Sequence, residues 1–294
     1  MSAATETAET TRVDAPANRT SAAFAACKAQ ERAALIPFVT GGYPTMPMTE
    51  KLLWALAEGG ADLIEIGVPF SDPLADGATV QHTSQVALDQ GTTLTDCLNL
   101  VRRVRADGFT VPLLFMGYSN PFYQYGLERL ARDAAEAGLD GFIIADLPID
   151  ESEEFLEPFR AAGLDLIFML APTSTEARIE AAASRASGFI YCVSLVGVTG
   201  ARDSLSDELP AYLARVRKHT DVPLAVGFGI STPDHVRATA ALADGVVVAS
   251  ALINHLDRLP HEEQPAAATA FVRAMAAATG KSGRTAAVAA GSEG

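Results

Sequence analysis

Short apolar runs alternate along this chain with longer amphipathic segments. Eight runs have the length and the Val, Ile and Leu content of buried strands: 33–40, 61–67, 111–116, 141–145, 165–170, 188–193, 222–226 and 244–249. Segments with helical spacing lie between them, among them 48–58, 95–106, 127–137, 175–187, 234–242 and 266–278. Gly or Pro introduces several of the strand candidates, as is typical of turns from a helix into a strand. The succession predicts an α/β fold, a single (β/α)8 TIM barrel with an extra N-terminal helix.

The domain organisation that this pattern predicts is simple. Residues 1–20, rich in Ala, Thr and Glu, are expected to form a disordered extension, and residues 281–294 a disordered tail. The barrel is expected to occupy residues 21–280 as one domain. A doubly wound open sheet is the alternative, but no G-x-G-x-x-G motif follows the first strand candidate.

Composition narrows the classes of partner. The 294 residues are 49% hydrophobic, which suffices for one large core. With 22 basic and 36 acidic residues the chain carries a net charge of −14 and should repel nucleic acid and anionic membranes. An anionic substrate would therefore be held by local dipoles. The absence of an apolar run of ~20 residues, the lack of a secretory signal and three scattered cysteines predict a cytoplasmic protein with reduced thiols.

Several chemistries are disfavoured by the residues available. The four lysines lie outside the strand candidates, so neither a Schiff-base aldolase nor covalently held pyridoxal phosphate is expected. The five histidines show no H-x-H or H-E-x-x-H spacing, and we expect no metal site. No G-x-S-x-G elbow is present. What remains is acid–base chemistry by carboxylates and phenols.

The run 61–81, ADLIEIGVPFSDPLADGATVQ, supplies two candidate carboxylates. Glu65 falls inside a strand that should be buried on both faces, where an ionised side chain is costly unless it is paired or used. Asp76 follows in the loop after that strand and fits a turn or a helix cap equally well. Asp72 is the better capping candidate, because it precedes Pro73. The pair predicts a catalytic site at the carboxyl end of the strand.

A second cluster of candidates lies at the far end of the barrel. The seventh strand candidate leads into GFGIS, which contains Gly229, and Ser250 follows the eighth strand at the start of a helix. Glycine and a helix N-terminus at these two places are how many barrels hold phosphate. The small-residue loop 194–203 after the sixth strand could close over a substrate, or it could be a plain surface loop.

Aromatic residues could line a pocket near the carboxylates. Tyr191, at the end of the sixth strand, either points into the mouth or fills the core with its hydroxyl satisfied. Further candidates are Phe38, Tyr118, Phe168 and Phe228, although for each alone the sequence favours ordinary core.

Together these motifs resemble the alpha chain of tryptophan synthase. The matching runs are PFVTGGYP (37–44), the whole of 61–81, MGYSNPFYQYG (116–126), GFIIADLP (141–148), GVTGAR (197–202) and GFGIS (227–231). They cover residues 22–278 in the family's order. The segment 61–81 is highly specific, whereas GFGIS alone is not.

The resemblance implies a retro-aldol cleavage of indole-3-glycerol phosphate to indole and glyceraldehyde 3-phosphate. Such a reaction needs a group that moves protons at indole C3 or at the side-chain hydroxyl, and an anion near the ring N–H. By resemblance Glu65 takes the first role and Asp76 the second. The phosphate would be held by Gly200, Gly229, Ser250 and the Ala249 amide. Positions that match those surrounding the indole and glycerol parts, or supporting the mobile loops, are Phe38, Tyr118, Ala145, Asp146, Tyr191, Thr199 and Phe228.

The resemblance also implies a partner. In this family the alpha chain docks on a beta chain that carries pyridoxal phosphate, forming an αββα heterotetramer in which indole passes directly to the beta site. This chain itself would need no cofactor. The loops 69–77 and 194–203 would report occupancy of the site to the partner.

One departure and three alternatives remain open at this point. Ala249 stands where many relatives have glycine, so a positive φ there would be strained by its methyl group. The chain could be a stand-alone lyase that releases indole, or a non-catalytic activator of a beta chain. The presence of both Glu65 and Asp76 argues against a pure activator. Another phosphate-binding barrel, such as a sugar-phosphate epimerase or isomerase, is the third alternative.

Overall fold

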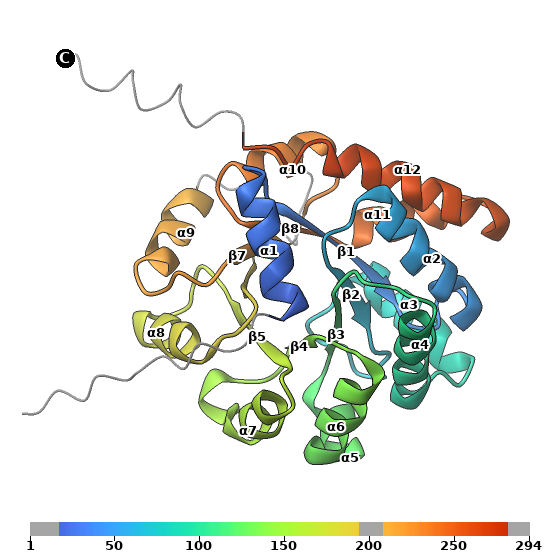
Figure 1. Ribbon diagram of the computed structural model, residues 1–294, viewed down its shortest axis with the longest axis horizontal. Coiled ribbons are helices and arrows are strands. Elements are labelled where there is room, and N and C mark those ends of the chain that lie inside the picture. The colour runs from blue at the N-terminus through green and yellow to red at the C-terminus, as the bar shows by residue number, and fades with distance from the viewer. Residues whose placement is uncertain (1–17, 194–207, 228, 282–294) are drawn as a thin grey trace, which may run out of the picture.

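Eight parallel strands close into a barrel in chain order, β1 to β8, in the computed structural model, which describes residues 18–193, 208–227 and 229–281. The strands are β1 (Ala34–Thr40), β2 (Ile64–Gly67), β3 (Leu113–Gly117), β4 (Gly141–Ile144), β5 (Asp165–Leu170), β6 (Ile190–Val193), β7 (Leu224–Gly227) and β8 (Gly245–Val248). Each predicted strand is present with shifts of a few residues at its ends. The predicted TIM barrel is therefore confirmed, and Figure 1 shows its helices ringing the strands.

The described helices surround this ring. They are α1 (Arg19–Ala29), α2 (Met46–Gly59), α3 (Ala78–Asp89), α4 (Leu94–Ala106), α5 (Ser119–Tyr125), α6 (Leu127–Ala137), α7 (Glu153–Ala161), α8 (Glu176–Arg185), α9 (Leu209–Arg217), α10 (Pro233–Ala240), α11 (Ser250–Leu256) and α12 (Gln264–Ala276), with short 3-10 turns at Ile149–Glu151 and His261–Glu263. The six predicted helices correspond to α2, α4, α6, α8, α10 and α12, and the extra N-terminal helix is α1. Among the helices of the described ranges, none is long and apolar enough to cross a membrane.

Threonine N-caps explain where several of these helices begin. Thr45, Thr93, Thr175 and Thr232 each accept a hydrogen bond from the backbone N–H three residues later. At α4 the Asp96 carboxylate also accepts the Thr93 backbone N–H, which completes a capping box. These local signals fix the helix starts that follow the strands.

The ordered barrel extends slightly beyond its predicted limits. Asn18 caps α1, which begins at Arg19, so residues 18–20 belong to the barrel and not to the predicted extension. At the other end the Lys281 N–H donates to the Glu31 carbonyl at 2.8 Å. The remaining parts of the predicted extension and tail, residues 1–17 and 282–294, lie outside the described residues.

Two apolar layers form the core. One lies between the strands and the surrounding helices. The other fills the barrel interior, where Leu63, Leu114, Ile143 and Ile167 meet. Helix α1 belongs to this inner layer through residues such as Phe24, whose ring lies 5.5 Å from that of Phe189. Because α1 fills the interior from the amino ends of the strands, access to the interior is left at the carboxyl ends.

At the amino ends of the strands, which form the base of the barrel, one kind of hydrogen bond recurs and joins each odd-numbered strand to the next even-numbered strand. A leucine N–H near the start of the odd strand donates to a side-chain oxygen just before the even strand. The four pairs are Leu35–Asp62 (2.9 Å), Leu113–Asp140 (2.8 Å), Leu166–Ser187 (3.2 Å) and Leu224–Asp244 (3.0 Å). Asp140 also binds Arg19 and Arg105, at 2.6 and 2.8 Å. We refer to these four pairs as the base clasps.

Candidate active site

Glu65 points into the barrel interior. Its neighbours along β2, Ile64 and Ile66, belong to the outer core, and Leu63 belongs to the inner one, so the alternation of the strand turns Glu65 inward. The residue is 1% exposed, and its Oε1 atom has no hydrogen-bond partner among the described residues. Burial raises the pKa of Glu65 to about 8. At neutral pH the side chain is therefore mostly protonated.

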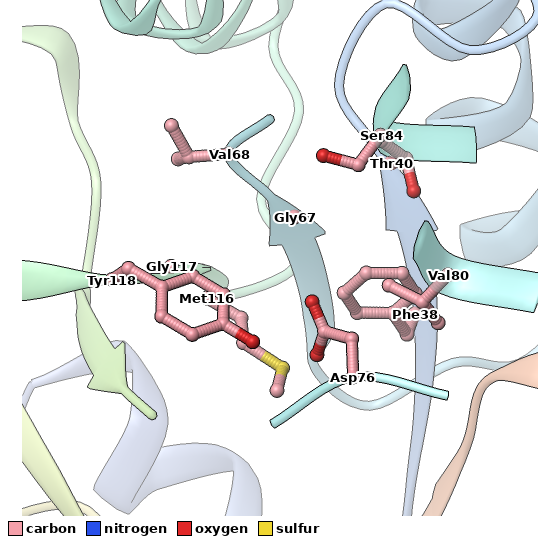
Figure 2. Close-up of a pocket in the computed structure, with 10 residues that line it drawn as sticks. All are labelled: Phe38, Thr40, Gly67, Val68, Asp76, Val80, Ser84, Met116, Gly117 and Tyr118. Atoms are coloured by element: carbon pink, nitrogen blue, oxygen red, sulfur yellow. The ribbon is translucent and has the colours of Figure 1, made fainter. Parts of the chain in front are cut away.

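Asp76 lies in the loop between β2 and α3, directly before the Gly77 cap of α3. Its N–H donates to the Pro73 carbonyl at 3.0 Å, which fixes a tight turn. Burial raises the pKa of Asp76 to about 6, and a hydrogen bond with Tyr118 acts in the opposite direction. Asp76 is thus mostly ionised at neutral pH. The turn interpretation is confirmed, and the turn directs the carboxylate into the pocket drawn in Figure 2.

Tyr118 ties this loop to the barrel. It is the N-cap residue of α5 and is 5% exposed. Its hydroxyl accepts the Ala75 N–H at 3.0 Å, and its ring lies 5.2 Å from the ring of Phe70. Burial, followed by the charge of Asp76, raises the pKa of Tyr118, so the phenol stays protonated and can donate to the Asp76 carboxylate. Figure 2 shows the Tyr118 hydroxyl and the Asp76 carboxylate in the same space below Gly67.

Tyr191 lies near both carboxyl groups, Glu65 and Asp76. It belongs to the inner core of β6 and is 4% exposed. Burial, then the charges of Glu65 and Asp76, raises the pKa of Tyr191, which means that the phenol lies within electrostatic reach of both. A Cβ atom at Gly227 would lie 2.1 Å from its hydroxyl oxygen. Glycine on β7 therefore makes room for the phenol. The structure places Tyr191 in the inner core with its hydroxyl beside the carboxyl end of β7.

The pocket around Asp76 is lined by both predicted and unpredicted residues: Phe38, Thr40, Gly67, Val68, Asp76, Val80, Ser84, Met116, Gly117 and Tyr118. Phe38 fits because Gly67 has no side chain, since a Cβ there would lie 2.5 Å from the phenyl ring. Met116 was missed by sequence reasoning, although it follows the inward-facing Leu114 by two positions on β3. Of the two interpretations of Phe168, ordinary core is confirmed. It packs in the outer core, because its neighbour Ile167 takes the inward position on β5.

The end of β4 supports the pocket indirectly. The Ala145 N–H donates to the Gly117 carbonyl at 2.9 Å, which continues the ladder one residue past the strand. Asp146 accepts hydrogen bonds from the Ser119 N–H at 2.7 Å and from its hydroxyl at 2.9 Å. These bonds hold the first residue of α5, so the carboxylate of Asp146 positions the turn that carries Tyr118.

Only part of the predicted phosphate site lies within the residues that the structure describes. Gly229 is exposed and has a φ of 75°, a conformation that favours glycine. Ala249 has a φ of −116°, so its methyl group causes no strain of the kind considered above. Ser250 is the first residue of α11, half-buried, beside Ala249. The carboxyl ends of the adjacent β7 and β8 bring these residues to one side of the mouth. The entire loop 194–203, with Thr199 and Gly200, and Phe228 lie outside the described residues.

Fold and site together define a TIM barrel with two carboxyl groups of raised pKa near the carboxyl ends of its strands. The model of the family "Tryptophan synthase alpha chain" matches residues 24–280. The chain is 53% identical to the tryptophan synthase alpha chain of Roseiflexus sp. (strain RS-1) over 258 residues, covering 88% of this chain and 99% of that one. For the counterpart from Chloroflexus aggregans the identity is 50% over 263 residues, covering 89% and 98%.

Solved structures of tryptophan synthase alpha subunits resemble this fold. The tryptophan synthase subunit alpha from Legionella pneumophila superposes with a TM-score of 0.83 at 35% identity, covering 90% of this chain and 98% of that one. A chain of Mycobacterium tuberculosis tryptophan synthase gives 0.82 at 37% identity, with coverage of 90% and 98%. The chain belongs to the tryptophan synthase alpha chain family.

Proposed function

We propose that this chain cleaves indole-3-glycerol phosphate to indole and glyceraldehyde 3-phosphate, as the alpha subunit of a tryptophan synthase. The observation that supports this most is the separation of two pKa values at one site, about 8 for Glu65 and about 6 for Asp76. Near pH 7 one carboxyl group is an acid and the other is an anion, which is the division of labour that the cleavage requires.

In the proposed sequence Glu65 gives its proton to indole C3. This converts the ring to an electron-poor indolenine, whose developing positive charge at the ring N–H is stabilised by the Asp76 carboxylate. The C–C bond then breaks, its electron pair returning to the ring as the adjacent side-chain hydroxyl becomes the aldehyde. Glu65, now a carboxylate, takes the hydroxyl proton. The enzyme regains its starting protonation state, and no cofactor is needed for these steps.

The remaining site residues would bind and orient the substrate. Phe38, Tyr118 and Tyr191 would surround the indole, with Ala145 beside them. Gly229, the Ala249 amide and Ser250 would hold the phosphate through backbone N–H groups and the start of α11. Thr199, Gly200 and Phe228 keep the substrate-binding roles assigned from the family resemblance.

We further propose that the chain works in the cytoplasm within an αββα heterotetramer, in which pyridoxal phosphate is bound by the beta chain. Leu74, in the loop that carries Asp76, is 92% exposed, so this loop is accessible to another surface. Docking there would bear directly on the position of Asp76 and would couple the two sites.

Indole release from indole-3-glycerol phosphate by the purified chain, with and without a tryptophan synthase beta chain, tests the proposal. We expect slow release that rises strongly with the beta chain. Fast release that ignores the beta chain would identify a stand-alone lyase. Absence of release in both assays would overturn the proposed activity. Glu65→Gln is the matched variant, which should still bind the beta chain but should not cleave the substrate.

A further inference from the structure

Ser84 holds the start of the loop that carries Asp76. It lies on α3 and is 5% exposed. Its Oγ accepts the Phe70 N–H at 3.0 Å, and its hydroxyl donates to the Phe70 carbonyl at 3.2 Å. One side chain thus satisfies both main-chain groups of Phe70, where the chain leaves β2 and no longer has a strand partner.

The same loop has a second attachment, close to Asp76. There the Tyr118 hydroxyl accepts the Ala75 N–H at 3.0 Å. The two attachments are linked, because the ring of Phe70 lies 5.2 Å from the ring of Tyr118. Ser84 fixes Phe70, Phe70 packs on Tyr118, and Tyr118 fixes the residue before Asp76.

Between these attachments the loop is open to solvent. Residues 71, 72, 74 and 75 are exposed, and Leu74 is 92% exposed. The internal hydrogen bonds of this part are the Leu74 N–H to the Asp72 carbonyl and the Asp76 N–H to the Pro73 carbonyl. These short local bonds do not hold the loop against the barrel. The Gln81 side chain on α3 donates to the Pro73 carbonyl at 3.3 Å and to the Asp76 carbonyl at 3.0 Å, so the placement of the loop depends on these bonds together with the attachments at Phe70 and Ala75.

We infer that Ser84 is a positioning residue for the proposed cleavage, which places Asp76 by holding Phe70 and, through it, the ring of Tyr118. In Figure 2 the Ser84 side chain lies well apart from the Asp76 carboxylate and from the Tyr118 hydroxyl. Its influence on Asp76 therefore passes through the loop and the aromatic contact. The inference rests on the proposed function only for its activity assay.

The pH dependence of cleavage reports on this arrangement. Two titratable groups from the surrounding elements interact with Asp76: Tyr118 at the start of α5, which is hydrogen-bonded to it, and Tyr191 on β6, whose pKa is raised by the charges of Asp76 and of Glu65 on β2. Of these, Tyr118 donates the hydrogen bond that favours the ionised form of Asp76. If Tyr118 shifts when Ser84 is lost, Asp76 should ionise at higher pH and the acid limb of kcat/KM should move upward.

The test compares Ser84→Ala with Ser187→Ala. Ser187 makes the same kind of bond, accepting the Leu166 N–H at 3.2 Å, but at the opposite end of the barrel. Three properties are measured for each variant: Tm, the pH profile of kcat/KM, and chymotrypsin cleavage after Leu74, located by mass spectrometry. We expect similar losses of Tm, because each variant removes hydrogen bonds to buried backbone.

Only Ser84→Ala should lower kcat/KM, by about threefold to tenfold at pH 7, with an upward shift of the acid limb and about fivefold faster cleavage after Leu74. Equal effects of the two variants on all three properties would overturn the inference. An increase in KM alone, with unchanged cleavage after Leu74, would also overturn it, because it would indicate direct contact of Ser84 with substrate. If the unmodified chain does not cleave the substrate, the proposed function fails, while the protease comparison still decides the role of Ser84.

Discussion

Replacing Glu65 by Gln should stabilise the protein at alkaline pH while it abolishes cleavage. The pKa of Glu65 is about 8 in the folded chain, compared with an ordinary value of 4.5. Below pH 4.5 the carboxyl is protonated in both the folded and the unfolded chain. Between these two values the unfolded chain releases the proton and the folded chain keeps it, so stability falls as pH rises. Above pH 8 both states are ionised and the loss is complete.

The size of this effect follows from the two pKa values. Each pH unit across the interval corresponds to about 1.4 kcal/mol, so the full loss is about 5 kcal/mol. Between pH 5 and pH 8.5 the part that falls within the interval is about 4 kcal/mol. Glutamine carries no proton to lose. The free energy of unfolding of Glu65→Gln, relative to the unmodified chain, should therefore increase by that amount over this range.

Urea unfolding at pH 5 and pH 8.5 measures the difference. The single tryptophan, Trp54, is a suitable fluorescent reporter, since it is 40% exposed and its ring lies 5.0 Å from that of Phe109. The matched control is Glu58→Gln, because the Glu58 side chain is 71% exposed. A difference between Glu65→Gln and the unmodified chain that stays within about 1 kcal/mol at both pH values would refute the reasoning, since Glu65 would then not retain its proton in the fold.

Three further outcomes are expected. In the unmodified chain kcat/KM should peak near pH 7 and fall about tenfold by pH 5 and by pH 9. Asp76→Asn should remove the acid limb of this profile along with most of the activity. A flat pH profile of the unmodified chain would contradict the assignments of both Glu65 and Asp76. Gly227→Ala places a methyl group 2.1 Å from the Tyr191 hydroxyl and should lower kcat/KM about tenfold or more, whereas unchanged kinetics would show that Tyr191 has free space to move. Asp140→Ala leaves Arg105 and the Leu113 N–H without their buried partner and should cost about 3–5 kcal/mol in urea unfolding, with the activity per folded molecule preserved.

The strands and the inward position of Glu65 could be predicted because both depend on local pattern. A charged residue within an apolar run can be recognised in the sequence itself. Its burial follows because strands of a parallel sheet are buried on both faces. Phe168 shows the limit of this reasoning. Whether an aromatic residue faces the interior depends on the phase of the strand's alternation. The single polar residue of β5, Asp165, stands at its amino end and is followed by five apolar residues on both faces.

Support of the site by residues distant in sequence could not be predicted in this way. Ser84 sits in an amphipathic helix where a serine carries no special signal, and its role depends on Phe70 lying opposite it after folding. For Asp146 the family resemblance left open whether it surrounds the substrate or supports a loop, and only the structure shows that it holds the start of α5 through Ser119. Both depend on three-dimensional contacts that neither periodicity nor motif spacing encodes.

The base clasps divide the ring into four two-strand units, each closed by residues only 20–27 positions apart. Such short separations keep the entropy lost on closure small, so each unit can set the register of its own strand pair locally. At the mouth the side chains around Glu65 and Asp76 follow no such fourfold repeat. The two ends of the barrel can therefore be altered independently. Substitutions at the base would change the stability of the barrel, and substitutions at the mouth would change its substrate.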